Sequence, residues 1–351
     1  MEDTKYENIS KKKPTYPVKP FLGDYLSKYN RNVLIPVFYD DLLRFSGATE
    51  VYNEHGEDTL WVRVYYNEFE RITIDKDLKK VYSILHGDGS DTSVPFLNID
   101  AVDYCTFANS KPFRIKVRNI LNDNYTYMYV KKADASRVYG LELEHLLSPN
   151  RINFLVYKET LIEDHISGIP GDTFMDSGLD SSAISTQKQI AKEFVKFNER
   201  CIVRLLGDMR SYNYVIVPTH DFDQVRYRIR ATDFDQQCYE GRLRVYMPQF
   251  LKENKLYVQM VHNNLRPESI EQYKQEERST IAKRILLGKK RIRELLDCML
   301  QDNISSDFKI EQLKKDLFDY TKDKAFKECS CMGELLETAF KFVIRHYQDV
   351  K

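Results

Sequence analysis

Two stretches of the chain alternate apolar and polar residues in the way that paired strands do. Residues 112–120 and 125–132 alternate on either side of 121–124, where Asn and Asp supply turn chemistry. This pattern is typical of a β-hairpin. A second hairpin is predicted further along the chain, where the apolar run 214–217 precedes the strict alternation of 225–231.

The segments between and after these hairpins are predicted to be mainly helical. A helix is predicted over 135–147, with Asp134 as its N-cap, and two short strands follow at 152–157 and 160–165. Apolar residues at helical spacing predict a long helix over 182–206, and the chain from residue 267 onward has a helical pattern throughout. The order from residue 112 is therefore strand, strand, helix, strand, strand, followed by a mostly helical part.

Composition and charge narrow the class of protein. The chain has 351 residues, 42% hydrophobic and 30% charged, which fits a folded protein with two lobes or domains. Its 53 basic residues equal its 53 acidic residues, so we expect no general nucleic-acid binder. No apolar run approaches the roughly 20 residues that span a bilayer, so we expect no membrane partner. The six dispersed cysteines do not form a disulfide framework and favour a reducing, cytoplasmic location.

Two acidic motifs flank the second hairpin. Asp208 and Asn213 are five positions apart, after the predicted long helix and before the first strand. The sequence Thr-Asp-Phe-Asp at 232–235 follows the second strand. The tetrapeptide Asp-Phe-Asp-Gln occurs at 233–236 and also at 221–224, where it lies in the turn and points away from Asn213. As alternatives, the first motif is a plain helix-ending turn and the second a solvated acidic turn.

These motifs and the order of elements resemble the protein-kinase-like superfamily, most closely the aminoglycoside phosphotransferase and choline kinase group. The resemblance covers about residues 120–240. It implies an α+β, two-lobed protein-kinase-like fold, with a small antiparallel β lobe that has one helix and a larger, mostly helical lobe. The implied domains are an N-terminal extension over 1–95, a nucleotide-binding lobe over 96–165 and a catalytic lobe over 166–351.

The resemblance also implies roles for the acidic motifs. In that group one Asp receives or orients the acceptor hydroxyl, while an Asn and a second Asp hold Mg²⁺ against the triphosphate of ATP. Asp208 is then the catalytic base, and Asn213 and Asp233 are metal ligands. Asp235 is a candidate ligand of a second ion.

The smaller lobe is implied to supply the nucleotide contacts. Lys131 follows an apolar pair, as in Val-Ala-x-Lys, and is preferred to Lys132, since a strand turns only one of the two inward. Glu142 falls on the apolar face of the helix and is expected to pair with Lys131, whereas Glu144 falls on the polar side.

The connector 161–166 resembles the hinge between lobes. Its backbone, at Glu163 and His165, is implied to bind the adenine edge of the nucleotide. Two features of the family are missing. The segment 102–111, where the glycine-rich loop that covers the phosphates is expected, contains no glycine, and Leu206-Gly207 precedes Asp208 where the family usually has a His.

The predicted function is therefore an ATP- and Mg²⁺-dependent phosphotransferase, with a nucleotide and an unidentified small-molecule acceptor as partners. The main alternative is a catalytically inactive, kinase-like binding or scaffold protein. Nucleotidyl transfer on the same fold, or an unrelated α+β protein in which the spacings are accidental, are further alternatives.

Overall fold

The computed structural model describes residues 13–87, 92, 94–176, 184–221 and 224–347. Contacts divide these residues into two units. The sheet unit contains 14–135 and 152–165, and the helical unit contains Lys13, 136–151 and the described residues from 166 onward. The α+β class predicted from the sequence is confirmed.

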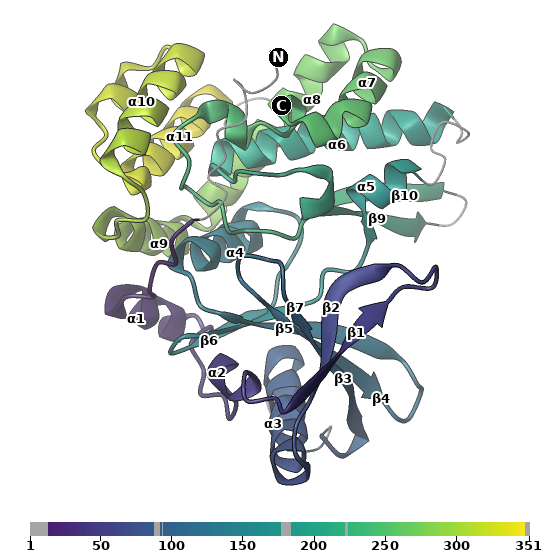
Figure 1. Ribbon diagram of the computed structural model, residues 1–351. Coiled ribbons are helices and arrows are strands. Elements are labelled where there is room, and N and C mark those ends of the chain that lie inside the picture. The colour runs from purple at the N-terminus through teal and green to yellow at the C-terminus, as the bar shows by residue number, and fades with distance from the viewer. Residues whose placement is uncertain (1–12, 88–91, 93, 177–183, 222–223, 348–351) are drawn as a thin grey trace, which may run out of the picture. The chain divides into compact units, whose positions relative to one another are not determined.

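The sheet unit is built on an antiparallel sheet. Within the described residues it has seven strands in the order β1-β2-β3-β4-β5-β7-β6 (Figure 1). Its strands are β1 (Gly47–Tyr52), β2 (Asp58–Tyr65), β3 (Leu97–Cys105), β4 (Phe113–Asn119), β5 (Tyr125–Lys132), β6 (Phe154–Tyr157) and β7 (Thr160–Asp164). Its helices are α1 (Pro20–Lys28), α2 (Tyr39–Leu42), α3 (Glu68–His86) and the 3-10 helix η2 (Val94–Phe96). The first predicted hairpin is confirmed as β4 and β5, and the two short strands are β6 and β7.

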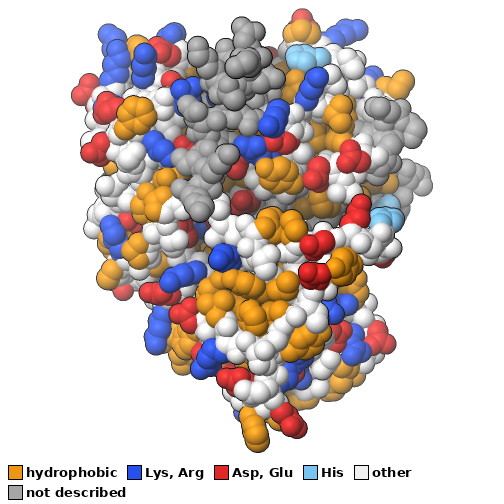
Figure 2. All heavy atoms as spheres, viewed as in Figure 1, with side chains coloured by type: hydrophobic (Ala, Val, Ile, Leu, Met, Phe, Trp, Pro, Cys, Tyr) orange, Lys and Arg blue, Asp and Glu red, His pale blue; other side chains and the backbone are white. Residues whose placement is uncertain are grey.

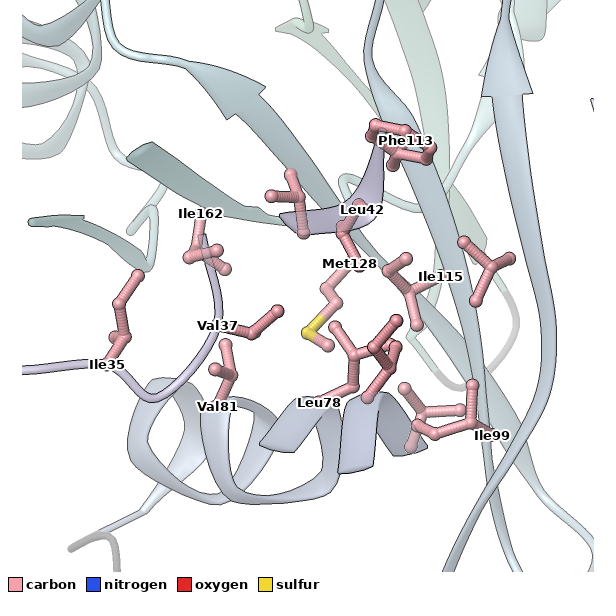
Figure 3. Close-up of a cluster of buried hydrophobic side chains, with 14 of the residues drawn as sticks. Ile35, Val37, Leu42, Leu78, Val81, Ile99, Phe113, Ile115, Met128 and Ile162 are labelled. Carbon is pink, nitrogen blue, oxygen red and sulfur yellow. The ribbon is translucent and has the colours of Figure 1, made fainter. Parts of the chain in front are cut away.

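One face of this sheet packs against α3 (Figure 3). Because side chains alternate along a strand, Ile115 of β4 and Met128 of β5 reach the same face, where they meet Leu78 and Val81 of α3. Asn67 caps the helix by accepting a 3.0 Å hydrogen bond from the backbone N–H of Glu70. Burial of one apolar side chain of this size stabilises the folded state by roughly 1.5–3 kcal/mol.

The helical unit combines helices with a second, smaller sheet. Its helices are α4 (Ala135–Leu147), α5 (Gly171–Asp176), α6 (Ile184–Arg204), α7 (Lys255–Asn264), α8 (Pro267–Leu287), α9 (Lys289–Gln301), α10 (Asp307–Thr321) and α11 (Met332–Tyr347). Its strands are β8 (Ile169–Pro170), β9 (Tyr214–Asp221) and β10 (Gln224–Ala231). Its 3-10 helices are η4 (Ser211–Asn213), η5 (Leu243–Tyr246), η6 (Pro248–Phe250), η7 (Lys252–Asn254) and η8 (Lys324–Glu328). The second predicted hairpin is confirmed as β9 and β10, and α6 packs against β10, α7 and α8.

The two units differ from the predicted division at 95 and 165. Strands β1 and β2, predicted to belong to a separate extension, continue the same sheet as β3 to β7. Helix α4, predicted to belong to the nucleotide-binding lobe, groups with the helical unit from Ser136 onward.

Helix α4 is buried along most of its length, which corrects one prediction. Glu144 was expected on a polar side, but it is buried and paired with Arg204 of α6. The periodicity predicted an apolar stripe correctly, yet other elements of the helical unit also cover the remaining faces of this helix. Each buried charge is then stabilised by a partner of opposite charge.

The described surface carries both signs of charge. Figure 2 shows Lys and Arg side chains interspersed with Asp and Glu on the face in view, in keeping with the formal net charge of zero. None of the described helices is both long and apolar enough to cross a lipid bilayer.

Candidate functional site

The loop after α6 holds Asp208 in a constrained conformation. Its φ of 58° lies in the left-handed region, which costs energy for a residue other than glycine. Two backbone hydrogen bonds of 3.1 Å keep the loop there, from the N–H of Gly207 to the carbonyl of Gln236 and from the N–H of Asp208 to the carbonyl of Val245. The position of this carboxylate is therefore set by the segments that follow the hairpin.

Asn213 connects this loop to the second acidic motif. Its side-chain Nδ2 donates a 2.7 Å hydrogen bond to the backbone carbonyl of Asp208, which leaves the amide Oδ1 as the atom that can accept or ligate. Its own backbone carbonyl accepts a 3.0 Å hydrogen bond from the N–H of Thr232. This hydrogen bond brings Asp233, the next residue along the chain, close to Asn213, as predicted from the sequence.

Asn254, which sequence reasoning missed, supports the loop from the interior. This fully buried side chain donates a 2.8 Å hydrogen bond to the carbonyl of Met209 and accepts one of 2.9 Å from the hydroxyl of Tyr214. No pattern around Asn254 marks it in the sequence, because its partners lie about 40 residues earlier in the chain. It positions the loop between Asp208 and Asn213.

The carboxylate of Asp208 is mostly buried and surrounded by charge. Arg210 Nε lies 2.7 Å from Asp208 Oδ1, and Arg210 Nη1 lies 2.6 Å from Glu253 Oε1. The pKa of Asp208 is raised to about 6, mainly by burial, while Arg210 lowers it and the negative charges of Asp233 and Glu253 add to the rise. A general base works best with a pKa near the operating pH, so this environment suits Asp208 to accept a proton.

Asp233 and Asp235 share a partner that the sequence did not indicate. Arg137 Nη1 of α4 lies 2.7 Å from Asp233 Oδ1 and 2.8 Å from Asp235 Oδ1, and Arg137 Nη2 donates to the carbonyl of Thr232 at 3.3 Å. The Arg137 side chain is only 3% exposed. Both acidic residues thus pair with one guanidinium from their own unit, whose single positive charge offsets part of their combined negative charge.

The residues present fit one Mg²⁺ better than two. Among the described residues, no group of three or more His, Cys, Asp or Glu side chains is arranged to hold a metal ion. Mg²⁺ needs fewer protein ligands, since it keeps several waters and binds one or two carboxylates together with substrate phosphates. Asn213 Oδ1 and the partly exposed Asp233 fit that description. Asp235 fits a second ion less well, because the same guanidinium contacts both carboxylates and the Asp235 side chain is only 24% exposed, against 36% for Asp233.

Close approach of α4 to the acidic motif depends on Gly140. A Cβ added at this position would lie 2.9 Å from Phe234 Cβ and 3.3 Å from the Phe234 carbonyl oxygen. We expect Gly140→Ala to lower the free energy of unfolding by about 1–3 kcal/mol, since the backbone of the motif must shift to make room. Urea denaturation of the two proteins measures this difference.

Gly23→Ala is the matched control. Gly23 also lies within a helix, α1, but the nearest atom to an added Cβ is Asn32 Nδ2 at 4.0 Å. This substitution is expected to be neutral or to stabilise by up to about 1 kcal/mol, through helix propensity alone. Equal effects of the two substitutions would contradict close packing at Gly140.

Lys131 lies in the sheet unit and is buried, whereas Lys132 is exposed. The predicted pair between Lys131 and Glu142 is wrong. Lys131 Nζ lies 2.9 Å from Glu163 Oε2, and Glu142 Oε1 accepts a 2.7 Å hydrogen bond from Arg291 Nε of α9. The reason is the strand register, in which Tyr129 is opposite Glu163 and Lys131 is its diagonal neighbour on the same face.

The predicted hinge residues also lie in the sheet unit. The carboxylate of Glu163 is engaged by Lys131, and Glu163 is paired with Tyr129 of β5 on one side and with Phe154 of β6 on the other, so its backbone is not placed to bind an adenine edge as the resemblance implies. His165 lies beside Tyr127 and Tyr129, and the Tyr129 hydroxyl is 3.3 Å from its Nδ1. Burial lowers the pKa of His165, so the neutral imidazole is favoured.

Comparison with protein-family models gives no match for this chain, and comparison with curated proteins gives none either. Within the helical unit, hydrogen bonds place Asn213 between the backbone of Asp208 and the segment that carries Asp233 and Asp235.

Proposed function

We propose that the chain is an ATP- and Mg²⁺-dependent phosphotransferase that acts on a small-molecule hydroxyl acceptor. The observation that carries this proposal is the link between Asp208, Asn213 and Asp233. The Asn213 amide donates to the backbone of Asp208, and its carbonyl accepts from the residue before Asp233. A base and two oxygen ligands for a cation are thereby connected through two hydrogen bonds.

The proposed reaction assigns each of these residues a task. Asp208 accepts the proton of the acceptor hydroxyl as its oxygen bonds to the γ-phosphorus of ATP, and the bond from that phosphorus to the bridging oxygen of ADP breaks. Asn213 and Asp233 would hold Mg²⁺, which when bound neutralises charge on the phosphates. Positioning and charge neutralisation account for most of the rate in such reactions.

The sheet unit is proposed to supply the nucleotide contacts that the resemblance implies. Lys131 carries the ammonium group for the α- and β-phosphates, and the backbone at His165, just past the end of β7, serves the adenine edge. Lys131 is buried and paired with Glu163, whereas Lys132 is exposed and pairs with Glu159 at the surface, and this difference in burial favours Lys131.

The second candidate is a kinase-like binding or scaffold protein without turnover. Two observations favour it. Residues 102–111 contain no glycine to cover the phosphates, and Arg137 already pairs with both Asp233 and Asp235. A protein of this kind has no need of Mg²⁺ at the acidic motif.

A nucleotide titration separates the two candidates. We expect calorimetry to show ATP binding in the micromolar to roughly 1 mM range, as for enzyme substrates, in Mg²⁺ and much weaker binding in EDTA. Release of ADP in the presence of an acceptor would support the phosphotransferase, and release of pyrophosphate would instead indicate nucleotidyl transfer. A well-folded protein with no affinity for ATP in either buffer would support the scaffold.

A further inference from the structure

Arg137 contacts the acidic motif in the way that a bound cation would. A single nitrogen, Nη1, lies within 2.8 Å of one carboxylate oxygen from Asp233 and one from Asp235. The second terminal nitrogen donates to the carbonyl of Thr232, which is also an oxygen. Three oxygens of one short segment therefore converge on one guanidinium.

The segment around these carboxylates is held tightly in place. The N–H of Asp235 donates to Asp233 Oδ1 at 3.2 Å, and Ser136 Oγ of α4 donates to the Asp235 carbonyl at 3.1 Å. Two carboxylates that share one contact atom repel each other unless a positive charge lies between them. Arg137 supplies a positive charge between the two carboxylates that offsets this repulsion.

We propose that the Arg137 guanidinium is a resident cation that takes the place of a second divalent ion. The site then takes one Mg²⁺, at Asn213 and Asp233, and Asp235 is a partner of Arg137 and no metal ligand. This inference rests on the proposed function for the position of the single Mg²⁺. The guanidinium is suited to the task because it stays charged at every physiological pH and, when buried, cannot exchange with solvent cations.

The first test counts ions in the presence of nucleotide. Mn²⁺, which reports its binding by electron paramagnetic resonance, is titrated into protein saturated with a non-hydrolysable ATP analogue. We expect one ion per chain in the wild type, one in Asp235→Asn with unchanged affinity, and two in Arg137→Gln. Two ions in the wild type would overturn the inference, and so would an affinity loss of about 10-fold or more in Asp235→Asn, the size expected of a lost metal contact.

The second test needs no nucleotide. Arg137→Gln leaves two carboxylates together without their cation, so its melting temperature is expected to fall and then to rise again on addition of Mn²⁺ at millimolar concentration. The double variant Arg137→Gln/Asp235→Asn, with one carboxylate removed, is expected to lose this recovery. A melting temperature that does not respond to Mn²⁺ in Arg137→Gln contradicts the inference.

Arg291→Gln is the matched control. Arg291 is likewise an arginine paired with an acidic side chain, here the buried Glu142 of α4. Loss of the Arg291 guanidinium leaves one buried carboxylate, which is expected to take up a proton. The melting temperature of Arg291→Gln is therefore expected not to rise on addition of Mn²⁺. If Arg137→Gln does not fold, the Asp235→Asn titration decides the inference by itself.

Failure of the two proposals gives different results. A wild type that binds neither the nucleotide analogue nor Mn²⁺ removes the phosphotransferase proposal, whereas recovery of Arg137→Gln by Mn²⁺ still supports the resident cation. A wild type that binds nucleotide with two ions removes the resident cation and leaves the phosphotransferase in place.

Discussion

Replacing Asp208 with Asn is expected to lower the rate of phosphoryl transfer by about 10²–10⁴-fold, the usual contribution of a positioned general base. The loss falls on kcat, because Asn cannot take up the acceptor proton. Asn tolerates the left-handed backbone conformation that residue 208 adopts, so the loop is expected to keep its shape. The measurement is steady-state release of ADP with calorimetric nucleotide affinity beside it, and that affinity is expected to stay within a factor of about three.

Asp221→Asn is the control, since it makes the same substitution at an aspartate outside the proposed site. Asp221 begins the second copy of the tetrapeptide Asp-Phe-Asp-Gln, at the end of β9. Its side chain is 43% exposed and pairs with Arg226 across the hairpin, as a surface ion pair. We expect unchanged turnover in this variant. Equal turnover in the Asp208 and Asp221 variants would show that residue 208 is not the base.

Replacing Arg204 with Met is expected to lower the free energy of unfolding by about 3–5 kcal/mol, the size typical of a broken buried ion pair. Arg204 and Glu144 are both buried, and the pair joins α6 to α4. Met fills a similar volume but leaves the Glu144 carboxylate inside the protein without its counter-ion. Urea denaturation at neutral pH measures the loss, and this prediction holds whatever the chain catalyses.

Two further variants show whether the buried charge is the cause. The double variant Glu144→Gln/Arg204→Met removes both charges and is expected to recover most of the stability lost in the single variant. Arg293→Gln removes an exposed arginine from its pairs with Asp297 and Glu337 and is expected to cost less than about 1 kcal/mol. If the double variant is as unstable as Arg204→Met, the loss of stability is caused by altered packing around the arginine side chain and not by the buried charge.

The secondary structure could be predicted where the local pattern is strong. Both hairpins were predicted at the correct positions, because alternation fixes which residues face the core and turn residues fix where the chain reverses. The boundaries between units could not be predicted in the same way. Strands β1 and β2 join the sheet through long-range pairing, which leaves no trace in local periodicity.

The grouping of the acidic motifs could be predicted because it follows from hairpin geometry. Residues 208 and 213 belong to one loop, and pairing of Tyr214 with Ala231 brings residue 233 back to the start of β9. The partners of these motifs were not predictable. Arg137 precedes Asp233 by 96 positions and Asn254 follows Asp208 by 46, and nothing in their local sequence distinguishes them.

By itself, the sequence determined the two hairpins, the short strands β6 and β7, most helices of the helical unit, the inward choice of Lys131 over Lys132, and the arrangement of Asp208, Asn213 and Asp233 around one hairpin. Only the tertiary structure decided how the buried charges pair, namely Lys131 with Glu163, Glu142 with Arg291, and both acids of the second motif with Arg137. The physical reason is that periodicity fixes the direction of a side chain relative to its own helix or strand. Which oppositely charged group lies in that direction depends on the packing of segments far apart in the chain.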